Sequence, residues 1–219
     1  KREKTMLDEL ITVTLLRFLS KVCKPAVEEL KAWGRDTIRV YRFKNTLDIL
    51  EKTKGKLIFE NDKLQIHPQL LEKVFDKGSW VDDEDIQEYW ASLLKTSASE
   101  FPTTENSMYF DILSQLTKSE ILMIEYFCKE SKLDLNNPFQ INASKEGVII
   151  DAHEFYKIVG NSDSNRLASE IEHLKGLRLV ETGLGLASGF FQDSEDGKQK
   201  VGLKMSTLAI NFYHKVSAV

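Results

Sequence analysis

The sequence predicts a mainly α-helical protein, an N-terminal helical bundle followed by a winged-helix-like α+β domain with a small β-hairpin wing. Three observations support this fold class. Apolar residues recur every three or four positions along most of the first 116 residues, the spacing of one helix face. The last hundred residues read as helix, helix, turn, helix and then extended segments. A chain of 219 residues, 42% of them hydrophobic, can bury two cores, which we place at residues 1–116 and 117–219.

Two helices are expected to open the first domain. Met6–Val22 has its apolar residues on one face. A second helix begins near Pro25, which suits a first helical turn because no backbone N–H is needed there, and it reaches Glu51. Its expected buried stripe includes Ile38 and Tyr41. Its opposite face carries the candidate partner-binding residues Arg35, Arg39, Arg42 and Lys44.

Charge changes sign along this domain. Residues 1–56 hold 14 Lys or Arg and 8 Asp or Glu, whereas residues 57–116 hold 4 and 12. One interpretation is that the two segments fold against each other, because their potentials are complementary. The other is that the basic helix face is left free for an acidic partner.

The rest of the first domain alternates connections and short helices. We expect a connection over Thr53–His67 and a helix that resumes near Pro68 and ends at Lys77–Gly78, a cation and a glycine typical of a helix C-terminus. Ser79–Asp85 predicts the next helix start, with a capping serine and then four carboxylates in the first turn, where free backbone N–H groups favour them. A loop precedes the last helix, Met108–Leu116.

The second domain has the pattern of a winged helix, a fold that occurs in DNA readers and also in proteins that use it only for contacts. A turn at Gly160–Ser162 separates two of its helices, and a glycine-rich and acidic stretch over Thr182–Lys198 is the expected wing. The predicted helices are Lys118–Lys132, Asp151–Val159, Ser164–Lys175 and Ser206–Val216, and the predicted extended segments are Leu177–Val180 and Lys200–Lys204.

DNA binding by this domain would depend on cations that neutralise phosphates. The candidate nucleic-acid-binding residues are Arg166 and Lys175, on the helix that would read the bases. Glu170 and Glu172 on the same segment offset them, and the wing is acidic as well. The charges therefore favour protein contacts over DNA.

No motif for catalysis, a metal or a cofactor is found. The carboxylates of Asp82–Asp85 are expected to cap a helix, since no histidine accompanies them. Cys128 lies beside an apolar helix stripe and is expected to be buried. The glycines of Gly183–Gly189 lack the following helix and the lysine of a phosphate-binding loop, so they are interpreted as wing glycines. The chain is therefore expected to be non-enzymatic.

Localisation is expected to be cytoplasmic. No segment approaches the roughly 20 apolar residues that a membrane-spanning helix needs. The first residues lack the cleavage pattern of a secretory signal, and the two cysteines stand 105 positions apart, which fits reduced thiols.

Three segments resemble the bacterial Abi-alpha (abortive infection alpha) family. They are Lys24–Leu30, Tyr41–Lys52 and Asp82–Leu94, the last with acidic residues leading into Ile-Gln-Glu-Tyr-Trp-Ala-Ser-Leu-Leu. The likeness covers residues 22–130 well and parts of 174–212 loosely. The resemblance implies a mostly helical cytoplasmic bacterial protein associated with phage defence, and it supplies no catalytic residues.

Together these observations predict a non-enzymatic helical interaction module of bacterial anti-phage defence that needs no cofactor. Its expected partner is a protein, either another defence component or a second copy of itself. A winged-helix DNA-binding regulator is the alternative. A third class, a hidden nuclease or other toxin, would depend on a carboxylate such as Glu84.

Overall fold

The computed structural model describes residues 37–57, 64–131, 147–181, 191–193 and 199–217. The chain divides into two compact units, Leu116–His214 and a first unit formed by Lys1–Gln115 with Lys215–Val219. The two units are described separately below. The predicted helix Met6–Val22, Arg35 and most of the predicted wing lie outside the described residues.

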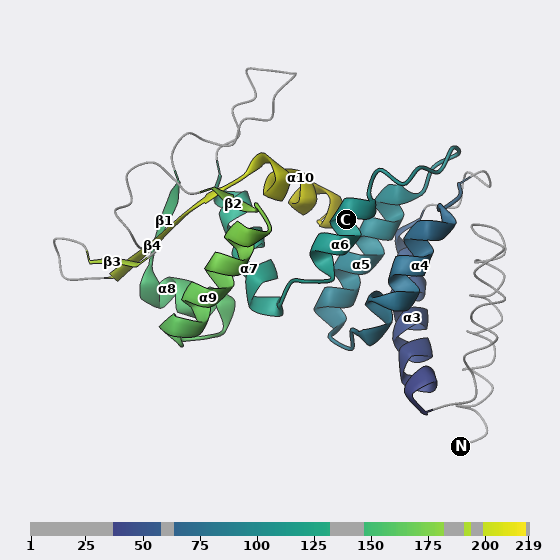
Figure 1. Ribbon diagram of the computed structural model, residues 1–219, viewed down its shortest axis with the longest axis horizontal. Helices are drawn as coiled ribbons and strands as arrows, with labels where there is room; N and C mark the ends of the chain where they lie inside the picture. Colours follow the sequence, from purple (N-terminus) through teal and green to yellow (C-terminus); the bar gives the residue numbers. More distant parts are fainter. Residues whose placement is uncertain (1–36, 58–63, 132–146, 182–190, 194–198, 218–219) are drawn as a thin grey trace. The chain divides into compact units, whose positions relative to one another are not determined.

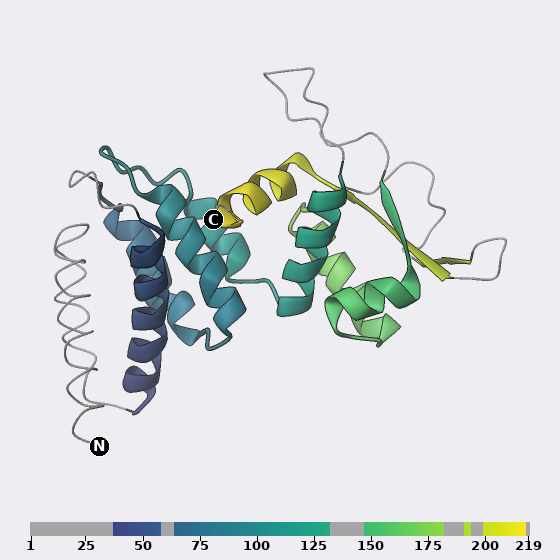
Figure 2. The same cartoon turned by 180° about the vertical axis from the view of Figure 1, so that it is seen from behind.

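The described part of the first unit is helical. α3 and α5 pack along each other and lie side by side in both views (Figure 1 and Figure 2). Its core combines the buried faces of these helices with Leu70, Val74 and Phe110. The elements are α3 (Thr37–Lys56), α4 (Pro68–Asp76), the single 3₁₀ turn η1 (Gly78–Trp80), α5 (Glu84–Ser97) and α6 (Ser107–Leu113).

The helix α3 is longer than predicted. It continues to Lys56, so the expected connection from Thr53 onward is wrong over its first four residues. The physical reason is tertiary packing, because Ile49, Leu50 and Thr53 are all fully buried and continue one stripe toward α5. The Thr53 hydroxyl donates a 2.8 Å hydrogen bond to the Ile49 carbonyl oxygen, so its polar atom is satisfied inside the core.

The expected ends of α4 are confirmed, and the expected start of α5 needs a correction. α4 runs from Pro68 to Asp76, directly before the predicted Lys77–Gly78 stop. α5 is capped by Asp83, whose side chain accepts hydrogen bonds from the backbone N–H groups of Asp85 and Ile86, at 3.0 and 3.2 Å. The predicted cap, Ser79, belongs instead to η1 and is buried.

Gly78 is required by close packing. A Cβ at this position would lie 3.1 Å from the Cε3 atom of the Trp90 ring and 3.3 Å from Ile49. Trp90 is fully buried and contacts the Phe110 ring, with centroids 5.7 Å apart. The absence of a side chain at Gly78 therefore lets η1 lie against the tryptophan at the centre of this core.

The second unit adds a small antiparallel sheet to its helices. α7 packs against α8, α9 and the strand β4. The described elements follow one another as α7 (Lys118–Glu130), β1 (Val148–Asp151), α8 (Ala152–Val159), α9 (Ser164–Gly176), β2 (Val180–Glu181), β3 (Phe191–Asp193), β4 (Gln199–Met205) and α10 (Thr207–Val216), whose last two residues belong to the first unit. The protein is thus mainly α-helical with a small β part, as predicted.

Strand β4 is the centre of this sheet (Figure 1). Val201 pairs with Ile150 of β1 and with Phe191 of β3, so these two strands lie on opposite edges of β4. β2 pairs with the far end of β4, through Val180 and Met205. Strand β1 was not predicted, because its short apolar run is stabilised by pairing with a strand about 50 residues away in sequence.

Candidate functional site

The strongest candidate for a binding surface is a cluster of Tyr41 and Arg42 on α3 with Trp80 on η1, which we call the platform. The Arg42 Nε donates a 3.0 Å hydrogen bond to Ser79 Oγ, and its Nη2 donates a 2.7 Å bond to the Phe75 carbonyl oxygen. Its guanidinium carbon lies 4.8 Å from the centroid of the Trp80 ring. The Tyr41 hydroxyl lies 3.5 Å from the Trp80 carbonyl oxygen.

The platform combines a rigid base with exposed rings. Ser79 is buried and donates from its hydroxyl to the Phe75 carbonyl oxygen at 2.5 Å, so the groups that hold Arg42 are themselves held. Trp80 is nevertheless 52% exposed and Tyr41 40% exposed. Trp, Tyr and Arg are the residue types that most often dominate protein–protein binding energy, especially when they are fixed before binding.

The predicted partner-binding residues do not share one helix face. Arg39 and Lys44 are exposed on α3, but at 3.6 residues per turn they point about 140° apart around the axis. Arg42 lies in line with Thr46 and Ile49, both fully buried, and it is only partly exposed. Its assignment to a solvated basic face is therefore corrected: Arg42 joins α3 to η1, and its polar groups are satisfied by Ser79 and Phe75.

The predicted buried stripe at the start of this helix is also wrong. Ile38 is 58% exposed, and Tyr41 belongs to the exposed platform. The stripe that packs is set by Asn45, Thr46, Ile49, Leu50 and Thr53. Asn45 is tolerated inside because its side-chain amide donates a 3.0 Å hydrogen bond to the Ser79 carbonyl oxygen.

The basic and acidic segments of the first unit do meet. Lys52 and Lys56 of α3 both pair with Glu88 of α5, at 3.1 and 3.0 Å. Burial alone would raise the pKa of Glu88, but the hydrogen bonds from Lys56 and Lys52 outweigh it and hold the pKa below its usual value. Part of the positive charge of α3 is thus compensated within the unit, as one of the two interpretations of the charge pattern predicted.

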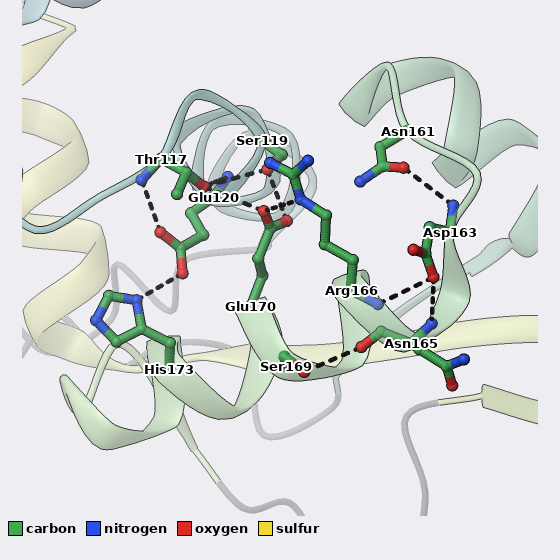
Figure 3. Close-up of polar contacts among 10 residues, drawn as sticks. All are labelled: Thr117, Ser119, Glu120, Asn161, Asp163, Asn165, Arg166, Ser169, Glu170 and His173. Atoms are coloured by element: carbon green, nitrogen blue, oxygen red, sulfur yellow. Dashed lines mark hydrogen bonds and ion pairs between the residues drawn. The ribbon is translucent and has the colours of Figure 1, made fainter.

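The second candidate surface is α9, the helix that would read DNA. Figure 3 shows two buried carboxylates, Glu120 on α7 and Glu170 on α9, at the centre of a polar network between these helices. Glu170 accepts hydrogen bonds from Ser119 Oγ at 2.6 Å and from Arg166 Nε at 3.2 Å. Glu120 accepts from the Thr117 backbone N–H at 2.7 Å and lies 2.6 Å from His173 Nδ1.

Both candidate nucleic-acid-binding residues are paired within α9. Arg166 pairs with Glu170, and Lys175 pairs with Glu172 at 2.9 Å. A cation that already faces a carboxylate contributes less to binding a phosphate, because the carboxylate repels the phosphate. The other exposed side chains on this helix include Asn165, Ser169 and His173. The charge distribution on α9 therefore differs from that of a basic recognition helix in a DNA groove.

The contacts between α7 and α9 and the exposure of Trp80 have little or no local signal in the sequence. The Thr117-x-x-Glu120 spacing is a capping-box signature, and the structure forms both of its hydrogen bonds. The contacts from Ser119 and Glu120 to α9 had no local signal, since they join positions about 50 residues apart. No local signal in the sequence separates a core tryptophan from an exposed one, so the exposure of Trp80 is known only from the structure.

The residues considered for chemistry occupy structural positions. Asp83 caps α5, and Glu84 and Asp85 lie in its first turn. Cys128 is buried, and this burial raises the pKa of its thiol to about 12. Among the described residues, no group of three or more His, Cys, Asp and Glu side chains is placed to hold a metal ion. The glycines of Gly183–Gly189 lie outside the described residues.

Among the helices of the described ranges, none combines the length and the apolar character needed to cross a bilayer.

Comparison with known proteins places the chain in a family. The model of the family described as abortive infection alpha matches residues 40–201, a range that includes most of α3 and extends to the middle of β4. Neither the curated proteins nor the solved structures contained a match. The family match covers well over half of the 219 residues and includes the platform, the α7–α9 network and most of the sheet. This chain therefore belongs to the abortive infection alpha family, whose description associates it with abortive infection.

Proposed function

We propose that this chain is a non-enzymatic helical interaction module of bacterial anti-phage defence, which acts in the cytoplasm by binding a protein partner through the platform. The observation that carries the proposal is the stacking of Arg42 on a half-exposed Trp80. A half-exposed tryptophan held beside an arginine offers a partner apolar area and positive charge that are already positioned before binding. The family's association with abortive infection supports the defence setting.

The geometry suggests what kind of surface the partner presents. Tyr41 and Trp80 provide flat apolar area with few rotatable bonds, so little conformational entropy is lost on binding. Arg39 is exposed less than one helical turn from Arg42 and adds positive charge beside the rings. A partner with an apolar or aromatic anchor flanked by carboxylates would satisfy both features.

The proposal is tested by phage challenge of bacteria that express the full chain. Trp80→Ala and Arg39→Gln should each reduce protection, since the first removes a platform ring and the second removes the exposed positive charge three residues from Arg42. Lys44→Gln is the matched control, because it removes one positive charge from the same helix on the side that faces away from Arg42. Protection that survives Trp80→Ala, with the protein still folded and present at the normal level, would contradict the proposal.

A winged-helix DNA-binding regulator is the second candidate. The order helix, strand, helix, helix and sheet in the second unit favours it, and the ion pairs of Arg166 and Lys175 count against it. Duplex binding would weaken as salt is raised and would weaken further in Arg166→Ala. A change in protection with Arg166→Ala but not with Trp80→Ala would favour this alternative.

A further inference from the structure

A second exposed apolar feature of the first unit lies in the loop between α5 and α6. Phe101 is 84% exposed, more than any other large apolar residue in the described part of the chain. Glu100 and Glu105 flank it and are exposed as well. We call Phe101 with these two carboxylates the plug.

The loop that carries the plug is fastened at its base. Ser99 exchanges two backbone hydrogen bonds with Gln65, at 2.8 and 3.0 Å. At the other end of the loop, the Asn106 side-chain amide donates a 2.8 Å hydrogen bond to Ser97 Oγ. The tip is thereby held out from the unit before any binding, which lowers the entropy lost on contact.

The plug and the platform lie at opposite ends of one helix. Trp80 precedes the first residue of α5, Glu84, and Phe101 follows its last residue, Ser97. A helix of 14 residues is about 20 Å long at 1.5 Å per residue. The rigid helix therefore keeps the two features apart within one copy of the chain.

The two features match in chemistry. The platform presents aromatic rings and, three residues from Arg42, the exposed Arg39, whereas the plug presents an aromatic ring and the exposed carboxylate of Glu105. Aromatic pairs and arginine–carboxylate pairs are favourable contacts across an interface. The plug thus supplies the apolar anchor and the negative charge that we expect of a partner for the platform.

We infer that the chain self-associates head to tail, with the plug of one copy seated on the platform of the next. The inference rests on the proposed function, because it names a second copy as the partner of the same platform. One such contact between two copies leaves a platform and a plug unused, so it is heterologous and builds closed rings or open filaments, whereas two reciprocal contacts would close a two-fold dimer.

Light scattering after size exclusion of the full chain measures the assembly. We expect the weight-average mass to rise from that of one 25.1 kDa chain as the concentration increases, over a range of about 1 to 100 µM that covers weak contacts. Phe101→Ala removes the plug and Trp80→Ala removes part of the platform, so each variant alone should stay monomeric. Ile149→Ala is the control and should behave as wild type, since Ile149 is an apolar residue of the second unit that is 59% exposed.

Mixing the two variants tests whether the plug of one copy binds the platform of another, and growth of the wild-type mass beyond two chains then separates head-to-tail assembly from a closed two-fold dimer. Phe101→Ala retains an intact platform and Trp80→Ala retains an intact plug, so an equimolar mixture should form one productive contact and stop at a dimer. A symmetric contact in which each surface pairs with itself predicts no such rescue. Failure of the mixture to dimerise would overturn the inference.

Exchanging the charges of Arg39 and Glu105 tests whether these two residues face each other across the contact. Arg39→Glu and Glu105→Arg should each weaken assembly, because each places like charges across the contact. The double variant restores opposite charges and should assemble again. A wild-type chain that remains monomeric throughout the concentration range would also overturn the inference. The proposed function would still stand in that case if Trp80→Ala abolished protection, and it would fail if protection were unchanged.

Discussion

The Ser119 hydroxyl donates a 2.6 Å hydrogen bond to the buried carboxylate of Glu170, so a residue in the first turn of α7 is joined to the middle of α9 (Figure 3). The same carboxylate also accepts a hydrogen bond from Nε of Arg166. The position of α9 is therefore set by a polar contact as well as by its apolar face, Leu167, Ile171 and Leu174. Buried polar contacts of this kind specify one arrangement, since a shifted helix would leave a charge without a partner.

Replacing Glu170 by Ala should destabilise the chain by about 1 to 3 kcal/mol, because the buried Ser119 hydroxyl loses its acceptor and Arg166 loses its ion pair. Urea unfolding of the full chain, followed by far-UV circular dichroism, measures the change. Glu172→Ala is the control, since Glu172 is an exposed residue of the same helix and pairs with Lys175 at the surface. Equal effects of the two substitutions would show that the Ser119–Glu170 contact adds no stability.

Replacing Gly78 by Ala should destabilise the first unit by about 1 to 3 kcal/mol, because the new methyl group would press on the Trp90 ring in a packed core. Gly55→Ala provides the opposite case. No atom lies within 4 Å of a Cβ at Gly55, and the residue is inside α3, so alanine should stabilise by about 0.5 to 1 kcal/mol. Thermal unfolding of both variants tests the pair, and a Gly78→Ala variant as stable as wild type would argue against the close packing.

The ion pairs of Glu88 should make stability depend on pH. The folded pKa of Glu88 is lowered, so its contribution is fully present above the unfolded glutamate pKa of about 4.3 and is lost as the pH falls through the lower folded value. Wild type should therefore have a higher Tm than Glu88→Gln at pH 7, and the difference should shrink below about pH 4. A difference that stays constant with pH would mean that Lys52 and Lys56 do not act through the charge of Glu88.

Cys128 should be unreactive in the folded chain. With its pKa raised to about 12 by burial, the thiolate at pH 8 is rarer by roughly a thousandfold than for an ordinary cysteine, and access is restricted as well. The measurement is iodoacetamide labelling of a Cys23→Ser variant, followed by mass spectrometry. Labelling should be slow in buffer and fast in denaturant, and rapid labelling of the folded variant would place Cys128 at an accessible position.

Local signals predicted those features that depend on neighbouring residues. Pro68 and the Lys77–Gly78 pair marked the two ends of α4, and the expected helix from Ser164 agrees with α9 to within one residue. These predictions succeeded because a proline, a capping side chain or a glycine acts on backbone groups within one turn of itself. The family resemblance was likewise carried by contiguous segments, and the family match confirms it.

Features that depend on distant residues could not be predicted in this way. The sequence analysis placed Arg35, Arg39, Arg42 and Lys44 on one basic face, yet the packing of α3 on α5 and η1 turns Arg42 inward. The separation of Arg39 from Lys44, in contrast, follows from the helical period alone. Strand β1 forms only because β4 pairs with it. The exposure of Trp80 is also a property of the folded surface, since the sequence is equally consistent with a core residue and an interface anchor at this position.

The sequence by itself determined the helical character of this protein, the ends of several helices and its family, because these follow from periodicity, capping and contiguous motifs. Tertiary structure alone decided which cations are paired, which aromatic rings remain in contact with water and which buried carboxylates join α7 to α9. The physical reason is that pairing and burial depend on which surfaces meet, and those surfaces come from residues tens of positions apart in the chain.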